Sequence, residues 1–408
     1  MSASADQTAL PDVSLRQLQL AAIIGLLGIS YMFNSMDRQV FPALLSAIIP
    51  HFGLTLPQAG LVSTIFTVTV AIFGALSGWF MARFGRKTVL VGGLVAYSIF
   101  TLITPLASGF LSLATFRTLT GAGEALQIGA IYACLGGYFG NRRGTYMGVL
   151  QAFFGLGALL GPVIGTRLFA WTTSWELAFY AFGVTGILVA VAIAFAIPKI
   201  FSDAPETSSQ GTAATRATSS VLERNVLIAT TAFFLMGTTF FAYTSLYATY
   251  LHDKLGFSVA DAGTALGMYG LGAIGGAFGG WLGDRLGRLG AICVFVMLAA
   301  TAFAMFHGAT SLIAHSILSL CFGLAISGFL FARLMSMLQL SVHPDRIGYV
   351  VSMGLGAYYA PGPFAGYLFG KLAVLAGWAS ASVVMMVFPA ALAAVLIYFF
   401  DARRMRSV

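Results

Sequence analysis

Five charged side chains lie within long apolar stretches of the sequence: the four residues Asp37, Arg38, Arg117 and Glu124 of the first half, and Arg333 of the second. If these stretches cross a membrane, each ionised group costs at least about 2.5–3.5 kcal/mol and needs a partner, a water-filled cavity or a function. Asp37 and Arg38 are adjacent and would point about 100° apart around a helix, so we expect each to have a different partner. Arg117 and Glu124 are two helical turns apart, roughly 10 Å along one face, which leaves room for a ligand or a second charge between them.

These residue types can exchange protons and bind an anion. Burial favours a neutral carboxyl and a nearby arginine favours a charged one, so Asp37 and Glu124 are predicted to carry protons as their pairing changes. A guanidinium holds a carboxylate through two parallel bonds, which lysine cannot match, so Arg38 and Arg117 are predicted to bind a substrate once protonation releases them. A structural alternative stays open, in which Asp37–Arg117 or Arg38–Glu124 is a buried pair that locks two helices together.

Uncharged polar side chains near these four are candidates for the lining of a substrate pocket. Tyr31 and Asn34 lie one turn before the Asp-Arg pair, and Gln151 lies at bundle-centre depth in a later apolar stretch. The other candidates are tyrosines of the second half of the chain: Tyr243, Tyr247, Tyr269, Tyr358 and Tyr359. Tyr243 and Tyr247 share a helix face and could offer hydroxyls to a polyol or a carboxylate. For each aromatic residue, packing or an interfacial belt is the competing interpretation.

The composition indicates what must position these residues. Of the 408 residues, 59% are hydrophobic and only 8% are charged, whereas a soluble protein averages about 25% charged residues. At about 20 apolar residues per crossing, the length accommodates about twelve transmembrane helices, which excludes most water-soluble enzymes. No nucleotide-binding loop, catalytic triad or metal cluster is evident, and the three cysteines lie in apolar runs, so we expect no enzyme, no ATP-driven pump, no bound metal and no cofactor.

The apolar stretches divide into two sets of six, and we predict an all-α membrane protein built of two six-helix bundles. The first set covers about 18–46, 58–81, 88–107, 111–138, 145–170 and 176–197, and the second covers about 225–251, 259–283, 290–308, 311–338, 348–370 and 377–400. Residues 198–224 between them are rich in Ser, Thr, Ala and charge, which predicts a flexible cytoplasmic linker. The predicted bundles are therefore 1–197 and 225–408.

The basic residues predict the orientation in the membrane. With both termini in the cytoplasm, 15 of the 21 Lys and Arg residues fall inside, only Arg167, Lys254 and Lys371 fall outside, and three lie in the membrane. This bias follows the positive-inside rule and explains the basic excess without a nucleic-acid partner. We expect a multi-pass protein of a bacterial inner (plasma) membrane, with no cleaved signal peptide.

A repeated loop motif supports the division into halves. Gly78-Trp-Phe-Met-Ala-Arg83-Phe-Gly-Arg86 aligns with Gly280-Trp-Leu-Gly-Asp284-Arg285-Leu-Gly-Arg288 at an offset of 202 residues. The motif resembles the signature loop of the major facilitator superfamily, with Ala82 in place of the family's acidic residue in the first copy. The resemblance implies a cytoplasmic gate formed by Arg83, Arg86, Asp284, Arg285 and Arg288. Arg333 lies a short distance before a predicted cytoplasmic loop of the second half. It is expected either to line the inward exit or to reach lipid headgroups.

A second resemblance concerns the charged residues themselves. Asn34-Ser-Met-Asp37-Arg38 is similar to the Asn-Tyr-x-Asp-Arg segment of the anion:cation symporters, which include sialin, vesicular glutamate and bacterial sugar-acid transporters. Arg117-x-x-x-Gly-x-Gly-Glu124 resembles their fourth-helix pattern. The resemblance implies that the acids carry protons and that the arginines engage an anion or hold the acids. Ser35 departs from the aromatic residue that is usual in the family.

We therefore predict a secondary active transporter, a proton symporter of a small organic anion such as a carboxylate or sugar acid, which works as a monomer in the lipid bilayer. Two alternatives stay open. Spinster-type lysolipid and sphingolipid transporters carry Asn-x-x-Asp-Arg and Arg-x-x-x-Gly-x-Gly-Glu as well, and a drug/proton antiporter would use the same buried charges. At the repeat offset, Asp37, Arg38, Arg117 and Glu124 correspond to Thr239, Phe240, Ser319 and Ile326. This asymmetry favours a functional role for the charges.

Overall fold

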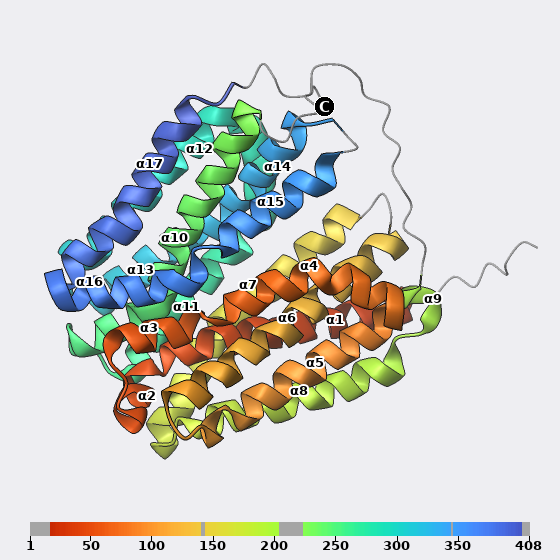
Figure 1. The fold of residues 1–408 in the computed structure, drawn as a ribbon, viewed down its shortest axis with the longest axis horizontal. Helices are drawn as coiled ribbons and strands as arrows, with labels where there is room; N and C mark the ends of the chain where they lie inside the picture. The colour runs from red at the N-terminus through yellow and green to blue at the C-terminus, as the bar shows by residue number, and fades with distance from the viewer. Residues whose placement is uncertain (1–16, 140–142, 204–222, 344–345, 402–408) are drawn as a thin grey trace, which may run out of the picture.

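The chain folds into long helices joined by short turns (Figure 1). The computed structural model describes residues 17–139, 143–203, 223–343 and 346–401. Over these ranges the secondary structure is helical, so the predicted all-α class is confirmed.

The helices of the first half are α1 (Gln17–Ala43), α2 (Leu45–Phe52), α3 (Leu56–Thr64), α4 (Phe66–Phe84), α5 (Arg86–Ile103), η1 (Thr104–Leu106), α6 (Phe110–Phe139), α7 (Arg143–Thr172), α8 (Glu176–Ala196) and α9 (Lys199–Ser202). Those of the second half are α10 (Arg224–Asp253), α11 (Val259–Ile274), α12 (Gly276–His307), α13 (Leu312–Gly323), η3 (Leu324–Leu330), α14 (Phe331–Ser341), α15 (Ile347–Tyr359), α16 (Gly362–Ser382), η5 (Val383–Val387) and α17 (Phe388–Tyr398).

Nine stretches among the described residues are long and apolar enough to cross a membrane. The longest of them, Ile347–Tyr398, has 52 residues, and a straight helix of that length would extend about 78 Å, more than twice the roughly 30 Å of a hydrocarbon core. The helix is broken at Gly377, whose φ of 82° is left-handed. α6 is not among the nine, and it carries Arg117, Glu124 and Gln127. The predicted number of twelve crossings stays a prediction.

Each half is held together by its own helix contacts. In the first half α6 packs on α4 and α5, and α5 packs on α8; in the second, α10 packs on α15 and α17, and α12 on α17. The predicted linker falls mostly on 204–222, outside the described residues, so the bundle boundaries stay predictions.

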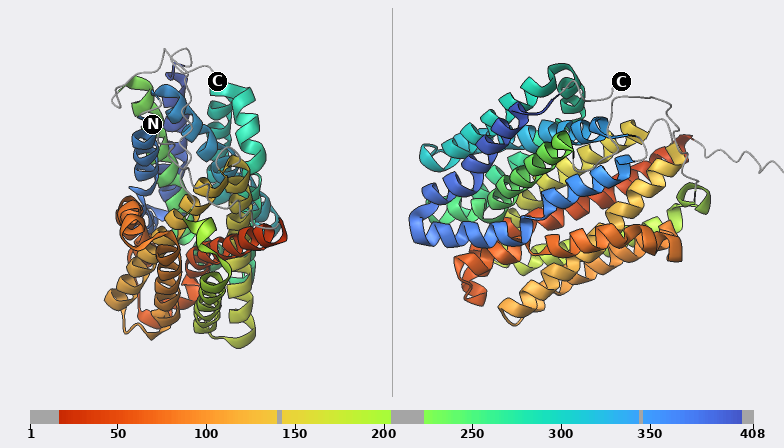
Figure 2. Two further views of the ribbon diagram at one scale, coloured as in Figure 1. Left: turned by 90° about the vertical axis from the view of Figure 1, so that its right-hand side faces the viewer. Right: turned by 45° about the horizontal axis from the view of Figure 1, so that its top comes forward.

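The two halves meet along α7–α11 and α3–α16. Gly60 of α3 and Gly366 of α16 touch backbone to backbone, so that a side chain on either would collide with the carbonyl of the other. Gly74 of α4 and Gly356 of α15, further along, have no atom within 4 Å of the position of a side chain. Figures 1 and 2 show the corresponding arrangement, in which the halves are joined at the end near α2, α3 and α16 and diverge toward the opposite end.

We call this opposite end the basic end, because it carries Arg83, Arg86, Arg285 and Arg288. It is the end that the basic residues predict to be cytoplasmic. With that orientation, the halves are closed toward the outside and separated toward the cytoplasm.

Candidate functional site

Glycines bring α6 close enough to its neighbours to bury charge between them. A side chain at Gly121 would collide with the carbonyl of Phe66 at the start of α4, and one at Gly123 would come within 2.6 Å of backbone atoms of Gly93 and Tyr97 in α5. Small residues permit such close helix approach in membranes. Arg117 and Glu124, on either side of these glycines, are therefore enclosed, and both are 0% exposed.

Asp37 pairs with Arg117 in a sealed environment. Arg117 Nη1 lies 3.1 Å from Asp37 Oδ2, and the hydroxyl of Thr101 in α5 donates to Asp37 Oδ1 at 2.7 Å. The guanidinium also lies 4.9 Å from the ring centroid of Phe41. Asp37 is only 1% exposed. Both carboxylate oxygens of Asp37 therefore accept a hydrogen bond, whereas Nε and Nη2 of Arg117 have no hydrogen-bond partner among the described residues.

Arg38 pairs with Glu124 at the interface between the halves. Arg38 Nε donates to Glu124 Oε2 at 2.8 Å, and Arg38 Nη1 donates to the hydroxyl of Tyr359 in α15, in the other half, at 3.4 Å. Arg38 is 8% exposed, the most accessible of the four charged residues. Arg38 Nη2 and Glu124 Oε1 have no hydrogen-bond partner within the part of the chain that the structure describes.

The four charges form one network. Glu124 also lies close enough to Asp37 and Arg117 to interact electrostatically with both. As expected from their adjacency, Asp37 and Arg38 have different partners. A structural lock would show the same two pairs, so the pairing alone does not reveal a ligand site. The spare donors on Arg38 and Arg117 and the spare acceptor on Glu124 are what a ligand or a proton could use, and Arg38 is the more accessible of the two arginines.

Polar side chains next to the charges are joined in two groups. Asn34 Nδ2 donates to Gln127 Oε1 at 2.7 Å, and Gln127 Nε2 donates to the carbonyl of Ser30 at 3.0 Å. In the second group, the hydroxyls of Tyr31 and Tyr132 lie 3.2 Å apart, and each lies 3.4 Å from Gln151 Oε1. Tyr31 thus contacts Gln151, whereas Asn34 bonds Gln127 in the other group, and the prediction that these residues line a substrate pocket stays a prediction.

Sequence reasoning missed four residues of this site. Gln127 and Tyr132 follow Glu124 in α6 by three and eight residues, so the helical period could have placed them on its face. Thr101 and Phe66 carry no such signal, because they reach the charges from α5 and α4. Phe66 lies beneath both arginines, with its ring centroid 5.3 Å from the guanidinium carbon of Arg38 and 5.9 Å from that of Arg117.

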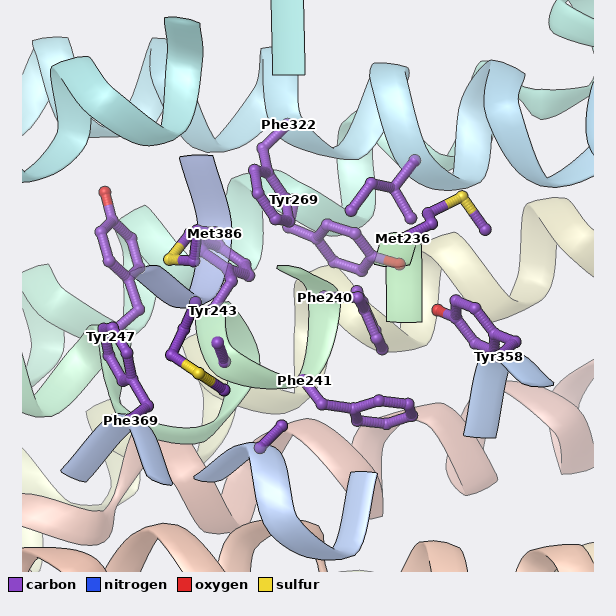
Figure 3. Close-up of a cluster of buried hydrophobic side chains, with 14 of the residues drawn as sticks. Met236, Phe240, Phe241, Tyr243, Tyr247, Tyr269, Phe322, Tyr358, Phe369 and Met386 are labelled. Carbon is purple, nitrogen blue, oxygen red and sulfur yellow. The ribbon is translucent and has the colours of Figure 1, made fainter. Parts of the chain in front are cut away.

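The tyrosines of the second half lie at different depths in one aromatic cluster (Figure 3). Tyr243 and Tyr247 are 0% exposed; Tyr243 stacks on Phe322, and the hydroxyl of Tyr247 lies 2.8 Å from Nδ1 of the buried His315. Tyr269, 1% exposed, places its hydroxyl 2.5 Å from Ser327 Oγ. These three side chains contact the interior of the second half.

Tyr358 and Tyr359 lie nearer the charges. Both interact electrostatically with Arg38, and Tyr359 is the one bonded to it. In Figure 3, Tyr358 lies at the opposite end of the cluster from Tyr247. Of the five predicted tyrosines of the second half, the structure therefore brings these two to the charge network.

Four of the predicted gate residues, Arg83, Arg86, Arg285 and Arg288, define the basic end. Arg83 is exposed at the end of α4. Arg288 Nη1 donates to the carbonyls of Tyr398 and Phe400 at 3.2 and 2.9 Å, which caps the end of α17 within its own half. Arg86 and Arg285 each take part in an interaction as well. The side chain of Asp284 lies outside the described residues. Arg333 is buried in α14, 5% exposed, and its role as a gate stays a prediction.

Comparison with known proteins agrees with this architecture. A solved bacterial homologue of the human lysosomal transporter Spinster, in an inward-facing and occupied conformation, superposes with a TM-score of 0.75, covers 96% of this chain and 100% of that one, and is 17% identical in sequence. A hexuronate transporter of Bacillus subtilis is 28% identical over 275 residues, which cover 64% of each protein. A cis,cis-muconate transport protein of Acinetobacter baylyi is 25% identical over 299 residues, 67% of this chain and 70% of the relative.

This chain aligns with less than two thirds of the length of the hexuronate transporter and of two other curated relatives. The family model for the Major Facilitator Superfamily, in contrast, matches residues 27–366, most of the described helices. This match confirms the predicted family and the prediction of a membrane transporter rather than an enzyme. The chain belongs to the Major Facilitator Superfamily.

Proposed function

We propose that the protein is a proton-coupled symporter of a small organic anion, a carboxylate or sugar acid. The observation that carries the proposal is the Arg38–Glu124 pair, in which the guanidinium has an unpartnered nitrogen and reaches across the interface to Tyr359. Two relatives are named for the anions hexuronate and muconate, which supports a carboxylate as the cargo.

Protonation of Glu124 is the proposed first step. A neutral Glu124 no longer balances Arg38, whose guanidinium can then take a substrate carboxylate through two parallel bonds. Proton and anion therefore favour each other's binding. A coupling of about 1–3 kcal/mol, the usual range between linked sites, would change the affinity for the anion roughly 5–150-fold.

Asp37 and Glu124 have unequal parts in this proposal. Asp37 accepts hydrogen bonds on both oxygens, from Thr101 and Arg117, whereas Glu124 has one oxygen without a partner. Proton exchange is therefore assigned first to Glu124, and Arg117 is assigned to holding Asp37. Arg117 has two nitrogens without a hydrogen-bond partner among the described residues, but it is 0% exposed, whereas Arg38 is 8% exposed and reaches Tyr359, so contact with the anion is assigned to Arg38.

Alternating access follows from where the pair lies. An anion on Arg38 is next to Tyr359 and so touches both halves, which can close around it. The close contact of Gly60 with Gly366 would then have to open for exchange with the other side. We place the protein in a bacterial plasma membrane as a functional monomer, with both termini and the basic end in the cytoplasm.

Uptake of labelled glucuronate and muconate into proteoliposomes tests the proposal. An inward proton gradient should drive accumulation of at least one of them, and Arg38→Ala should abolish it. Glu124→Gln should retain exchange of the anion across the membrane but lose gradient-driven accumulation. Glu176→Gln is the matched control, because this carboxylate lies at the start of α8 and bonds only Ser174 in the described contacts. Accumulation that persists in Glu124→Gln would remove Glu124 from the proton path.

A lysolipid transporter is the second candidate, and one observation favours it. A groove of about 590 Å³ lies between α1 and α8 and is lined mainly by apolar side chains, among them Ile23, Leu26 and Phe195. A lipid chain could enter such a groove from the side. Competition of lysophosphatidylcholine, but not of sugar acids, for binding would favour this candidate. Inhibition by cationic dyes, but not by anions, would instead indicate drug/proton antiport.

A further inference from the structure

Aromatic side chains from both halves lie near the guanidinium of Arg38. The guanidinium interacts electrostatically with Tyr31 of α1, Tyr132 of α6, and Tyr358 and Tyr359 of α15. Phe66 lies beneath it. The guanidinium assigned above to the substrate carboxylate therefore has aromatic neighbours in both halves, Phe66 in the first and Tyr359 in the second.

The first-half side of this arrangement is a loosely bonded aromatic group. The ring of Tyr31 packs at 6.1 Å on Tyr132 and at 5.4 Å on Phe154 of α7. The hydroxyls of Tyr31 and Tyr132 share the single oxygen of Gln151, each at 3.4 Å, which is near the limit of a hydrogen bond. Tyr132, Gln151 and Phe154 are each partly exposed, so their surfaces are not fully used in packing.

On the side of the second half, Tyr359 packs against other aromatic rings of that half. Tyr359 packs at 5.2 Å on Tyr358 and at 5.9 Å on Phe241 of α10. Tyr358 in turn stacks on Phe240 at 5.7 Å, and Figure 3 shows the labelled Tyr358, Phe240 and Phe241 side by side. The partly exposed Tyr359 is thus the member of the set that faces Arg38, with the others holding it in place.

Several polar side chains that could bind the hydroxyls of a sugar are enclosed, although Asn34 Oδ1 and the hydroxyl of Tyr243 have no hydrogen-bond partner among the described residues. Asn34 and Gln127 are 0% exposed and bond each other. Tyr243 and Tyr247, the pair expected to offer hydroxyls to a polyol, are also 0% exposed. A sugar acid needs several such partners, because each buried hydroxyl without a hydrogen bond costs binding free energy.

We propose that the substrate is a flat, unsaturated or aromatic carboxylate, bound with its carboxylate on Arg38 and its planar part between Tyr31–Tyr132 and Tyr359. This inference rests on the proposed transport of an organic anion and specifies the class of anion. Tyr132 and Tyr359 determine specificity in it, since a ring or conjugated chain stacks on an aromatic face in an offset or edge-on geometry, whereas a polyol does not gain that contact.

Binding to the purified full-length protein by isothermal titration calorimetry tests the inference. The probes are benzoate, its saturated analogue cyclohexanecarboxylate, and glucuronate. Benzoate should bind roughly 2–13-fold more tightly than cyclohexanecarboxylate, the range that aromatic contacts provide. In Tyr359→Leu and Tyr132→Leu this ratio should fall toward 1, while the affinity for cyclohexanecarboxylate changes little. Tyr349→Leu is the matched control, a tyrosine of the same α15 that contacts Arg346 instead and is 65% exposed; the ratio should be kept.

The outcomes separate this inference from the proposed function. If glucuronate binds most tightly, or if benzoate and its saturated analogue bind equally, the flat-substrate inference is overturned while the anion site on Arg38 stands. If Arg38→Ala leaves the binding of all three carboxylates unchanged, the proposed function itself fails. A variant that binds cyclohexanecarboxylate as the parent does is folded, so loss of the ratio in it cannot be attributed to misfolding.

Discussion

The two halves of the chain have the same loop motif and similar lengths but contrasting interiors. The first half buries Asp37, Arg38, Arg117 and Glu124; at the repeat offset, the second half has Thr239, Phe240, Ser319 and Ile326. Phe240 belongs to the ring cluster, and Thr239 bonds the carbonyls of Leu235 and Met386. Among the described residues, the buried ion pairs lie in the first half, while the second half buries Arg333 and packs an apolar, aromatic wall against the paired charges. A low-dielectric wall strengthens every electrostatic contact on the charged side.

Removal of Arg117 should have the largest effect on stability and uptake of all the substitutions that test this difference between the halves. Arg117→Ala leaves Asp37 buried without its cation, which costs about 3–5 kcal/mol. We expect a large fall in the melting temperature of the detergent-purified protein and loss of uptake. Ser319→Ala, the corresponding change in the second half, should alter the melting temperature little. If the two variants lowered the melting temperature equally, the proposed difference between the charged first half and the aromatic second half would be contradicted.

The pH dependence of anion binding distinguishes the two acids. Because protonation of Glu124 releases Arg38, binding should become stronger as the pH falls, by roughly 5–150-fold between the two limits. Glu124→Gln should bind at the low-pH affinity at every pH, whereas Asp37→Asn should keep the dependence if the Thr101 and Arg117 contacts hold that group apart. Titration calorimetry at several pH values measures this. If the pH dependence were retained in Glu124→Gln and lost in Asp37→Asn, Asp37 rather than Glu124 would be the acid that exchanges the proton.

The contact between the halves can be loosened at one glycine. In Gly366→Ala the new methyl group meets the carbonyl of Gly60, so the closed end should be destabilised by about 1–3 kcal/mol. Cysteines introduced near that end should become more reactive to a membrane-impermeant thiol reagent added from the outside, and transport should slow. Gly74→Ala, where nothing lies within 4 Å, should not change reactivity. Unchanged reactivity in Gly366→Ala would mean that this contact does not hold the outer end closed.

The smallest effect is expected from the helix cap at the basic end. Arg288 donates to the carbonyls of Tyr398 and Phe400, and a cation at a helix C-terminus contributes about 0.3–1 kcal/mol. Arg288→Ala should lower the melting temperature slightly without changing anion affinity. A large loss of transport at unchanged stability would instead favour the gating role that the loop motif implies.

Some features of the site could be predicted from the sequence because they depend on local periodicity. The seven-residue spacing of Arg117 and Glu124 places them on one helix face, and the adjacency of Asp37 and Arg38 requires separate partners. Both features depend only on helical geometry. The same helical period could have placed Gln127 and Tyr132 on the face of Glu124. The prediction of polyol-binding hydroxyls at Tyr243 and Tyr247 used that rule too, but helix rotation buries both in the second half.

The sequence by itself determined that the chain is an all-α membrane transporter whose four clustered charges lie in the first half, because hydropathy, charge bias and repeat spacing are properties of residue order. Only the tertiary structure decided which acid meets which arginine, that Thr101 and Phe66 complete the network, and that Tyr359 crosses the interface to Arg38. Those contacts join residues up to 321 positions apart. They depend on helix rotation and crossing, which small residues such as Gly121 and Gly123 permit and which no local pattern specifies.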